Sequence, residues 1–194
     1  MLWLVLVLSV AVLVAVLRGG RLTNLADIRV RWWWLLPLSF ALQQGTRLLP
    51  DEPWTDTAGV AMVLSSYVPL VALVFVNRTR SGMWLSGIGV LLNFTVILLN
   101  GGMPVLTEAA SVALRSTSPD IGNGYKHIAL DATTRLPFLA DVIPMRIAGS
   151  GTVLSLGDVF LAVGLAGFLE AELRRPVRWF KPGVKLSGGS ASGR

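Results

Sequence analysis

The 194-residue sequence has no cysteine, a single histidine, and charges on only 14% of its residues. Without cysteine there is no disulfide, no thiolate metal site and no thiol nucleophile. The zinc-hydrolase motif HExxH and the serine-hydrolase motif GxSxG are also absent. A soluble domain carries charges on roughly a quarter of its residues. The low charge, together with 53% hydrophobic residues and a mean hydropathy of +0.65, therefore indicates a membrane protein.

Five apolar segments have the roughly 17–25 residues that a helix needs to cross a bilayer. They lie at about 1–17, 32–49, 57–76, 83–99 and 152–169. We therefore expect an all-α membrane protein in which five transmembrane helices form one domain over residues 1–173. A structured outer loop of roughly 50 residues, 100–151, is expected between the fourth and fifth spans, and a basic, then Gly/Ser-rich cytoplasmic tail at 174–194.

The 17 lysines and arginines, which give a net charge of +6, are unevenly distributed. Most of them lie in segments 18–31 and 77–82 and in the tail from residue 174. Because cytoplasmic loops collect basic residues, the N-terminus is expected outside and the C-terminus in the cytoplasm. These bases follow apolar runs and do not alternate with aromatic residues. We therefore expect membrane lipids as partners and no nucleic acid, and the oligomeric state stays open.

Two aspartates are the main candidates for chemistry. Asp158 lies inside the fifth apolar run, where an ionisable side chain normally faces the bundle interior, and Ser155 shares its helix face. The expected topology brings Asp141 to the same outer boundary. If the connection folds back, the two carboxylates meet, and one of them holds a proton at neutral pH. Such a pair supplies the base and the acid of peptide hydrolysis without a metal or a cofactor.

The last span also carries Gly157 and Gly164, seven residues apart. Small residues at this spacing form a stripe that allows a neighbouring helix to approach closely. We therefore expect this helix to pack tightly in the bundle.

The order "NGGMPV", "DATTRLPFLAD", "SLGD" resembles the motifs of lipoprotein signal peptidase (signal peptidase II), an intramembrane aspartic peptidase of bacteria. The resemblance implies a lipidated or membrane-bound peptide substrate and a catalytic pair, Asp141 and Asp158. It further implies substrate-binding roles for Asn100, Gly102, Asp131 and Arg135, with Ser155 where that family has asparagine. That family has four spans, two of them between its first two motifs, whereas no apolar span separates Asn100 from Asp131 here.

A longer series of motifs covers nearly the whole chain: "RGGR", "RWWWLL", "NGGMPV", "YKH", "RLPFL.D.IP" and "S.GD". This order resembles an uncharacterised family of small bacterial multi-spanning membrane proteins, a domain-of-unknown-function family. The resemblance implies a multi-pass protein of the bacterial inner membrane and names no activity.

Other interpretations of the same residues remain open. Asp158 could bind Gln43, Gln44, Asn93 or Arg47 only to hold the bundle together, or carry a proton or cation in a small transporter or channel. The chain could also be a non-catalytic partner subunit of another membrane protein.

The loop residues have alternatives too. His127 is a candidate substrate contact or a proton donor beside Asp131, or a loop histidine that hydrogen-bonds a carboxylate or lipid headgroup. Lys126, Arg135 and Arg146 are candidates to bind a lipid phosphate or a substrate carboxylate.

Overall fold

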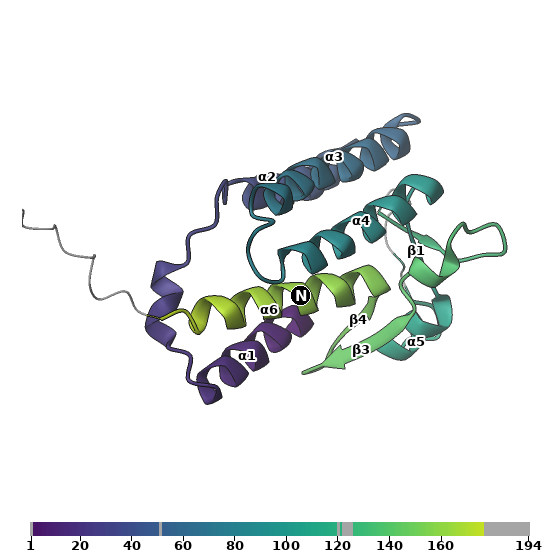
Figure 1. Cartoon of the computed structure of the whole chain (residues 1–194). Helices are drawn as coiled ribbons and strands as arrows, with labels where there is room; N and C mark the ends of the chain where they lie inside the picture. The colour runs from purple at the N-terminus through teal and green to yellow at the C-terminus, as the bar shows by residue number, and fades with distance from the viewer. Residues whose placement is uncertain (1, 51, 120, 122–125, 177–194) are drawn as a thin grey trace, which may run out of the picture.

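The structure, a computed structural model, describes residues 2–50, 52–119, 121 and 126–176. Its longer helices lie side by side in a bundle, and the strands gather at one end of it (Figure 1). The helices of the bundle are α1 (Leu2–Leu17), α2 (Leu35–Gly45), α3 (Thr55–Val76), α4 (Met83–Asn100) and α6 (Leu156–Leu173). Short 3₁₀ helices lie at η1 (Leu22–Asp27), η2 (Thr46–Leu48) and η3 (Pro137–Leu139).

Between α4 and α6 the chain forms a small mixed region that we call the strand end of the bundle. It contains β1 (Met103–Val105), α5 (Thr107–Leu114), β2 (His127–Ala129), β3 (Ile143–Ile147) and β4 (Ser150–Leu154). Strands β1 and β2 pair in parallel, and Asp141 forms a single parallel bridge to Val105 of β1. Strands β3 and β4 form an antiparallel hairpin whose two turn residues, Ala148 and Gly149, both have positive φ, as a tight two-residue hairpin turn requires.

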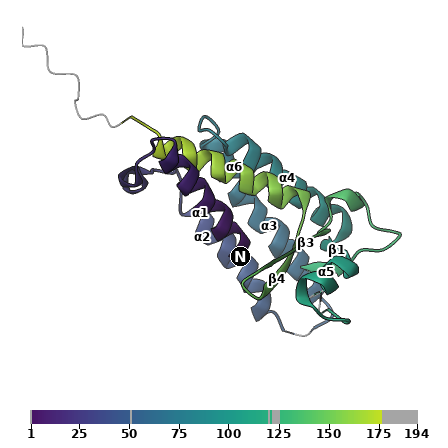
Figure 2. The same ribbon diagram turned by 90° about the horizontal axis from the view of Figure 1, so that it is seen from below.

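Helix α6 is central in the bundle, packed against α1 on one side and α4 on the other, while α2 packs against α3 (Figure 2). Glycines bring the backbones of α4 and α6 into contact. A Cβ added at Gly89 would lie 2.4 Å from the Gly157 carbonyl oxygen, and one at Gly164 would lie 2.3 Å from the Ser86 amide nitrogen. The close packing predicted for Gly157 and Gly164 is therefore confirmed.

The opposite end of the bundle, which we call the basic end, carries Arg18, Arg80, Arg174 and Arg175. Glu172 is 4% exposed and pairs with both Arg80 and Arg175 at 2.9 Å, while the more exposed Glu170 pairs with Arg18 at 2.8 Å. Asn24 of η1 and the Arg21 backbone amide both donate to the Leu173 carbonyl oxygen, which lies at the C-terminus of α6 beyond its internal hydrogen bonds. Ion pairs and side-chain hydrogen bonds thus stabilise the basic end.

The expectation of an all-α protein with five membrane spans is wrong. Among the described helices, two are long and apolar enough to cross a membrane, α3 and α4. Helix α1 is apolar but has 16 residues. The chain is a mixed α/β protein, because the loop expected at 100–151 contains two small sheets.

Local backbone conformation explains why the segments at 32–49 and 152–169 differ most from the spans expected from the sequence. In the run at 32–49, Trp32 has a φ of +58°, which a right-handed helix does not allow, so α2 starts only at Leu35 and has 11 residues. In the run at 152–169, the first residues belong to β4, and α6 starts after Ser155 and carries three acidic residues. The tail expected from 174 is described only to residue 176, and its remainder lies outside the described residues.

Candidate active site

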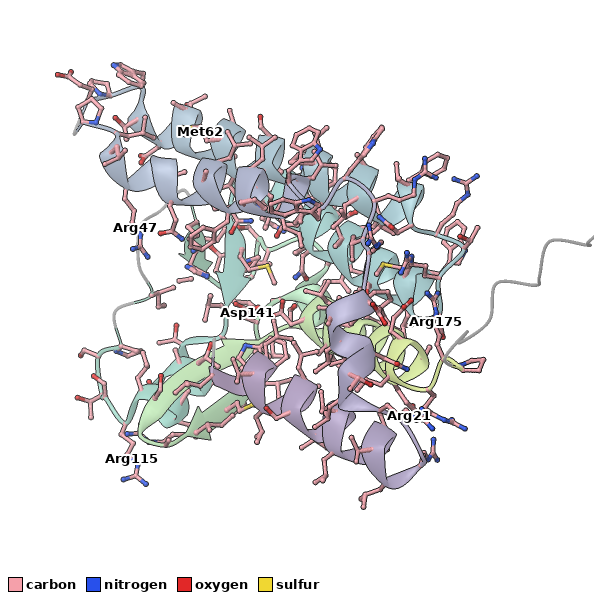
Figure 3. The ribbon with its side chains drawn as sticks, turned by 90° about the vertical axis from the view of Figure 1, so that its left-hand side faces the viewer. Arg21, Arg47, Met62, Arg115, Asp141 and Arg175 are labelled. Atoms are coloured by element: carbon pink, nitrogen blue, oxygen red, sulfur yellow. The ribbon has the colours of Figure 1, made fainter. Side chains whose placement is uncertain are left out.

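A cavity of about 360 Å³ lies at the strand end, and both candidate aspartates, Asp141 and Asp158, line it. Its walls come from α1, α3, α4, α6 and the two sheets, with Gln43 of α2 at one side. Figure 3 shows Asp141 in the space between the α2–α3 pair and the region formed by α1 and the hairpin. The two carboxylates, which are 17 residues apart in sequence, therefore line the same cavity.

The backbone of Asp141 is fixed by β1. Its amide donates to the Pro104 carbonyl oxygen at 2.8 Å, and its own carbonyl oxygen accepts from the Leu106 amide at 2.9 Å. The side chain is 7% exposed, and its Oδ1 has no hydrogen-bond partner. Burial, and then the nearby Asp158 charge, raises the pKa of Asp141 to about 8. Asp141 therefore carries a proton at neutral pH.

Asp158 sits in the first turn of α6, in a fully paired setting. The Asp158 amide donates to Ser155 Oγ at 3.0 Å, and Asp158 Oδ2 accepts from the Ser155 amide at 3.1 Å, so the two residues form a capping box. Asn93 of α4 donates from Nδ2 to Asp158 Oδ1 at 2.9 Å and accepts from Ser155 Oγ with its Oδ1 at 2.9 Å. Both oxygens of the Asp158 carboxyl thus accept hydrogen bonds, one from Asn93 and one from the Ser155 amide.

These contacts agree with one of the open alternatives, in which Asn93 holds Asp158. They do not exclude a chemical role, since a catalytic carboxylate also needs to be oriented. Asn93 and Ser155 orient the Asp158 carboxyl in the cavity that Asp141 also lines. The pair thus consists of a protonated, unpartnered carboxyl and an oriented acceptor.

Two further groups that line the cavity are His127, the first residue of β2, and Lys126 directly before it. Burial, and then the charge of Lys126, lowers the pKa of His127 to about 4, so this histidine is neutral at physiological pH. The sequence-based alternative of His127 as a proton donor beside Asp131 is not supported by this position, because Asp131 lines a different hollow.

The remaining predicted substrate-binding residues lie apart from the aspartate pair. Asn100 donates to the Arg135 carbonyl oxygen and accepts from the Arg135 amide at 2.8 Å, so it ties the loop to the end of α4. Both residues line a second hollow of about 290 Å³ together with Asp131. Hydrogen bonds from Thr133 lower the pKa of Asp131. Gly102, between α4 and β1, is buried.

Several cavity residues were not singled out from the sequence. Tyr67 of α3 and Trp3 of α1 reach the cavity from segments that the sequence predicts as apolar spans. A polar residue inside an apolar run is the signal that would have found Tyr67. Gln43 of α2, named from the sequence only as a possible partner of Asp158, also lines the cavity. Within the described parts of the chain, no three acidic or histidine side chains come close enough to hold a metal ion.

The fold and the cavity define a helical bundle with a small β region at one end and a carboxyl pair beneath it. Residues 27–169 match a family of unknown function (DUF5317), and the chain belongs to that family. It is 29% identical over 170 residues to an uncharacterized protein of Thermotoga maritima, a match that covers 87% of this chain and 90% of the relative. No solved structure matches the chain. Membership in a family of unknown function, which the motif order predicted, is confirmed, so function has to be argued from the cavity.

Proposed function

We propose that this protein is an intramembrane aspartic hydrolase, most concretely a peptidase that resembles lipoprotein signal peptidase, with Asp141 and Asp158 as its catalytic pair. The observation that carries the proposal is that both aspartates line one cavity. Burial, and then the Asp158 charge, raises the pKa of Asp141 to about 8, which favours Asp141 as the acid of the pair. Hydrolysis by two carboxyls needs one of them as the acid and the other as the base.

The proposed chemistry uses a water molecule between the two side chains. Asp158 accepts a proton from the water as its oxygen attacks the peptide carbonyl carbon. Asp141 then donates its proton to the leaving nitrogen as the C–N bond breaks, and the proton taken by Asp158 returns to Asp141 to restore the pair. Asn93 and Ser155 hold Asp158 in place throughout.

The surfaces of α3 and α4 support a membrane location for this chemistry. Less than half of each apolar stretch is buried within the protein, 28% for α3 and 39% for α4. Large apolar side chains such as Val68, Phe75 and Trp84 are more than half exposed, which is costly in water and favourable in lipid. Because bases collect on the cytoplasmic side, we propose that the basic end faces the cytoplasm of a bacterial inner membrane and the cavity faces outward.

The test is cleavage of a synthetic peptide that carries a diacylglyceryl-modified cysteine between a fluorophore and a quencher, with the protein in lipid nanodiscs. We expect cleavage at pH 7, and a loss of at least about 100-fold in rate for both Asp141→Asn and Asp158→Asn, since each removes one partner of the proton exchange. Asp56→Asn, which changes an exposed carboxylate at the start of α3, is the matched control and keeps the rate.

The two catalytic variants also separate this proposal from a transporter that uses Asp158 alone. If Asp141→Asn cleaves as fast as the wild type, the carboxyl pair is not the catalyst. A proton-coupled or ion-coupled flux that depends on Asp158 and survives in Asp141→Asn would point to transport instead.

A further inference from the structure

The cavity also contains positive charge that pairs with no acidic side chain among the described residues. Lys126, the residue before β2, lines it, and Arg47, in η2, lies close enough for its charge to add to burial in lowering the pKa of Lys126. Among the described residues, neither side chain forms an ion pair. Two cations near each other without a counter-ion repel, and an anion placed between them would remove that cost.

The carboxyl pair does not fill this role. The pKa of Lys126 is set by burial and by Arg47, and that of Asp141 by burial and by Asp158. Lys126 and both carboxyls line the same cavity, and among the described residues no ion pair joins them. A bound molecule has room to place an anionic group at Lys126 and another part at the aspartates. In Figure 3, Arg47 extends from the α2 side of this space, far from Arg21 and Arg175 at the basic end.

Part of the wall is apolar and comes mainly from the helices, and polar residues such as Gln43, Asn93 and Thr152 line the remainder. The apolar part includes Trp3, Leu4, Val63, Ile97, Leu154 and Leu161. A small inorganic anion would leave this wall in contact with water. A hydrocarbon chain would cover it, and burial of apolar surface stabilises such a complex in proportion to the area covered.

We propose that the cavity binds an amphiphile with a phosphate head, the head held by Lys126 and Arg47 and the chain lying against the apolar wall beside Trp3. This inference deepens the proposed function, since it gives the substrate an anionic, lipid-like part next to the reacting bond. Binding itself does not require that hydrolysis takes place.

Binding is measured with the full-length protein in a mild detergent, and the readout is quenching of tryptophan fluorescence. The three probes are dihexanoyl-phosphatidylglycerol, dihexanoyl-phosphatidylcholine and inorganic phosphate. We expect the Kd for the anionic lipid to be at least about ten-fold lower than for either of the others, because only this probe supplies both a net negative head and a chain.

Equal Kd values for the two lipids would overturn the proposal, because the cations would then not select the head. Phosphate that binds as tightly as the anionic lipid would also overturn it, since the chain would contribute nothing and the site would serve a free anion.

Variants separate the head site from general electrostatic attraction. The double variant Arg47→Ala/Lys126→Ala is expected to lose at least about ten-fold in affinity for the anionic lipid and to keep its weak affinity for the zwitterionic one. Arg115→Asn is the matched control: it removes a positive charge from the strand end, and asparagine tolerates the left-handed backbone of this residue (φ 53°). If Arg115→Asn loses as much affinity as the double variant, the specific site is ruled out.

The same assay on Asp141→Asn distinguishes this inference from the proposed hydrolase. The wild type could fail to cleave the peptide while Asp141→Asn still binds the lipid. That result would support the binding site and contradict the hydrolase proposal. Cleavage without any preference for the anionic lipid would retain the hydrolase and remove the site.

Discussion

The two ends of the bundle differ in how their buried charged groups are paired. At the basic end, buried Glu172 has two arginine partners, and Asn24 and Asn77 donate to backbone carbonyl oxygens at the ends of α6 and α3. At the strand end, Asp141 is also buried, but its Oδ1 has no partner among the described residues, and no described acid forms an ion pair with Lys126. Buried polar groups are normally satisfied because leaving them unpaired costs stability. The contrast indicates that the basic end is built for stability and the strand end for binding or chemistry.

The largest effect on stability is expected at the basic end. Glu172→Gln leaves Arg80, whose side chain is 18% exposed, without a buried counter-charge, and should lower the free energy of unfolding by about 3–5 kcal/mol. The measurement is unfolding in mixed detergent and SDS. Glu170→Gln, two residues earlier, is the control, and it should have little effect because its partner Arg18 is 61% exposed. Equal losses in the two variants would mean that burial does not distinguish the ion pairs.

At the strand end, by contrast, a substitution is expected to increase the free energy of unfolding. Because the pKa of Asp141 is raised to about 8 in the folded protein, the folded state binds a proton that the unfolded state releases near pH 4. The wild type therefore loses stability as the pH rises from about 4 to about 8. Asp141→Asn has no such loss, and its stability relative to the wild type should increase by on the order of 3–4 kcal/mol between pH 5 and pH 8.

The measurement for Asp141→Asn is the SDS unfolding midpoint at the two pH values. Asp56→Asn, at an exposed carboxylate, should show no comparable pH-dependent gain. A wild type and an Asp141→Asn variant with parallel pH profiles would show that Asp141 is ionised throughout and would remove the acid from the proposed mechanism. If Asp141→Asn is more stable than the wild type and no longer cleaves the peptide, Asp141 lowers the stability of the fold and is required for function.

The sequence predicted most of the helical bundle, because apolar length is a local signal. The runs expected at 57–76 and 83–99 became α3 and α4 with ends that moved by one or two residues. The start of α6 could have been predicted as well, since Ser155 and Asp158 have the spacing of a capping box. A continuous apolar run concealed the boundary with β4, because a short buried strand and a helix segment look alike in hydropathy.

The strands at the end of the bundle carry weaker signals. Strands β1 and β2 have three residues each, and the register between Met103 and His127 joins segments more than twenty residues apart, which no local pattern reveals. The β3–β4 hairpin could have been predicted from the sequence, because Ile143, Met145 and Ile147 alternate with other residues before a glycine-containing turn. The two aspartates were found as candidates by their polarity, whereas the missing partner of Asp141 and the position of Lys126 depend on the assembled walls of the cavity.

The close contact between α4 and α6, which we call the seam, runs between the two ends of the bundle. A substitution at one point of the seam can therefore perturb one end without the other. Near the basic end, a Cβ at Gly164 would lie 2.3 Å from the Ser86 amide nitrogen, so Gly164→Ala should destabilise the protein by about 1–3 kcal/mol through overpacking. Gly167→Ala is the control on the same helix, because its Cβ would meet nothing closer than 3.9 Å. It should be neutral or raise stability by up to about 1 kcal/mol, as alanine favours a helix over glycine.

The equivalent change near the strand end should affect function as well. A Cβ at Gly157 would lie 2.0 Å from Asn93 Oδ1, so Gly157→Ala displaces the side chain that orients Asp158. We expect Gly157→Ala and Gly164→Ala to lose similar stability, and only Gly157→Ala to lose peptide cleavage, by at least about ten-fold in kcat. The measurement pairs SDS unfolding with cleavage in nanodiscs under conditions where both variants remain folded. If Gly164→Ala impairs cleavage to the same extent, the seam transmits strain along its whole length, and the two ends do not act as separate regions.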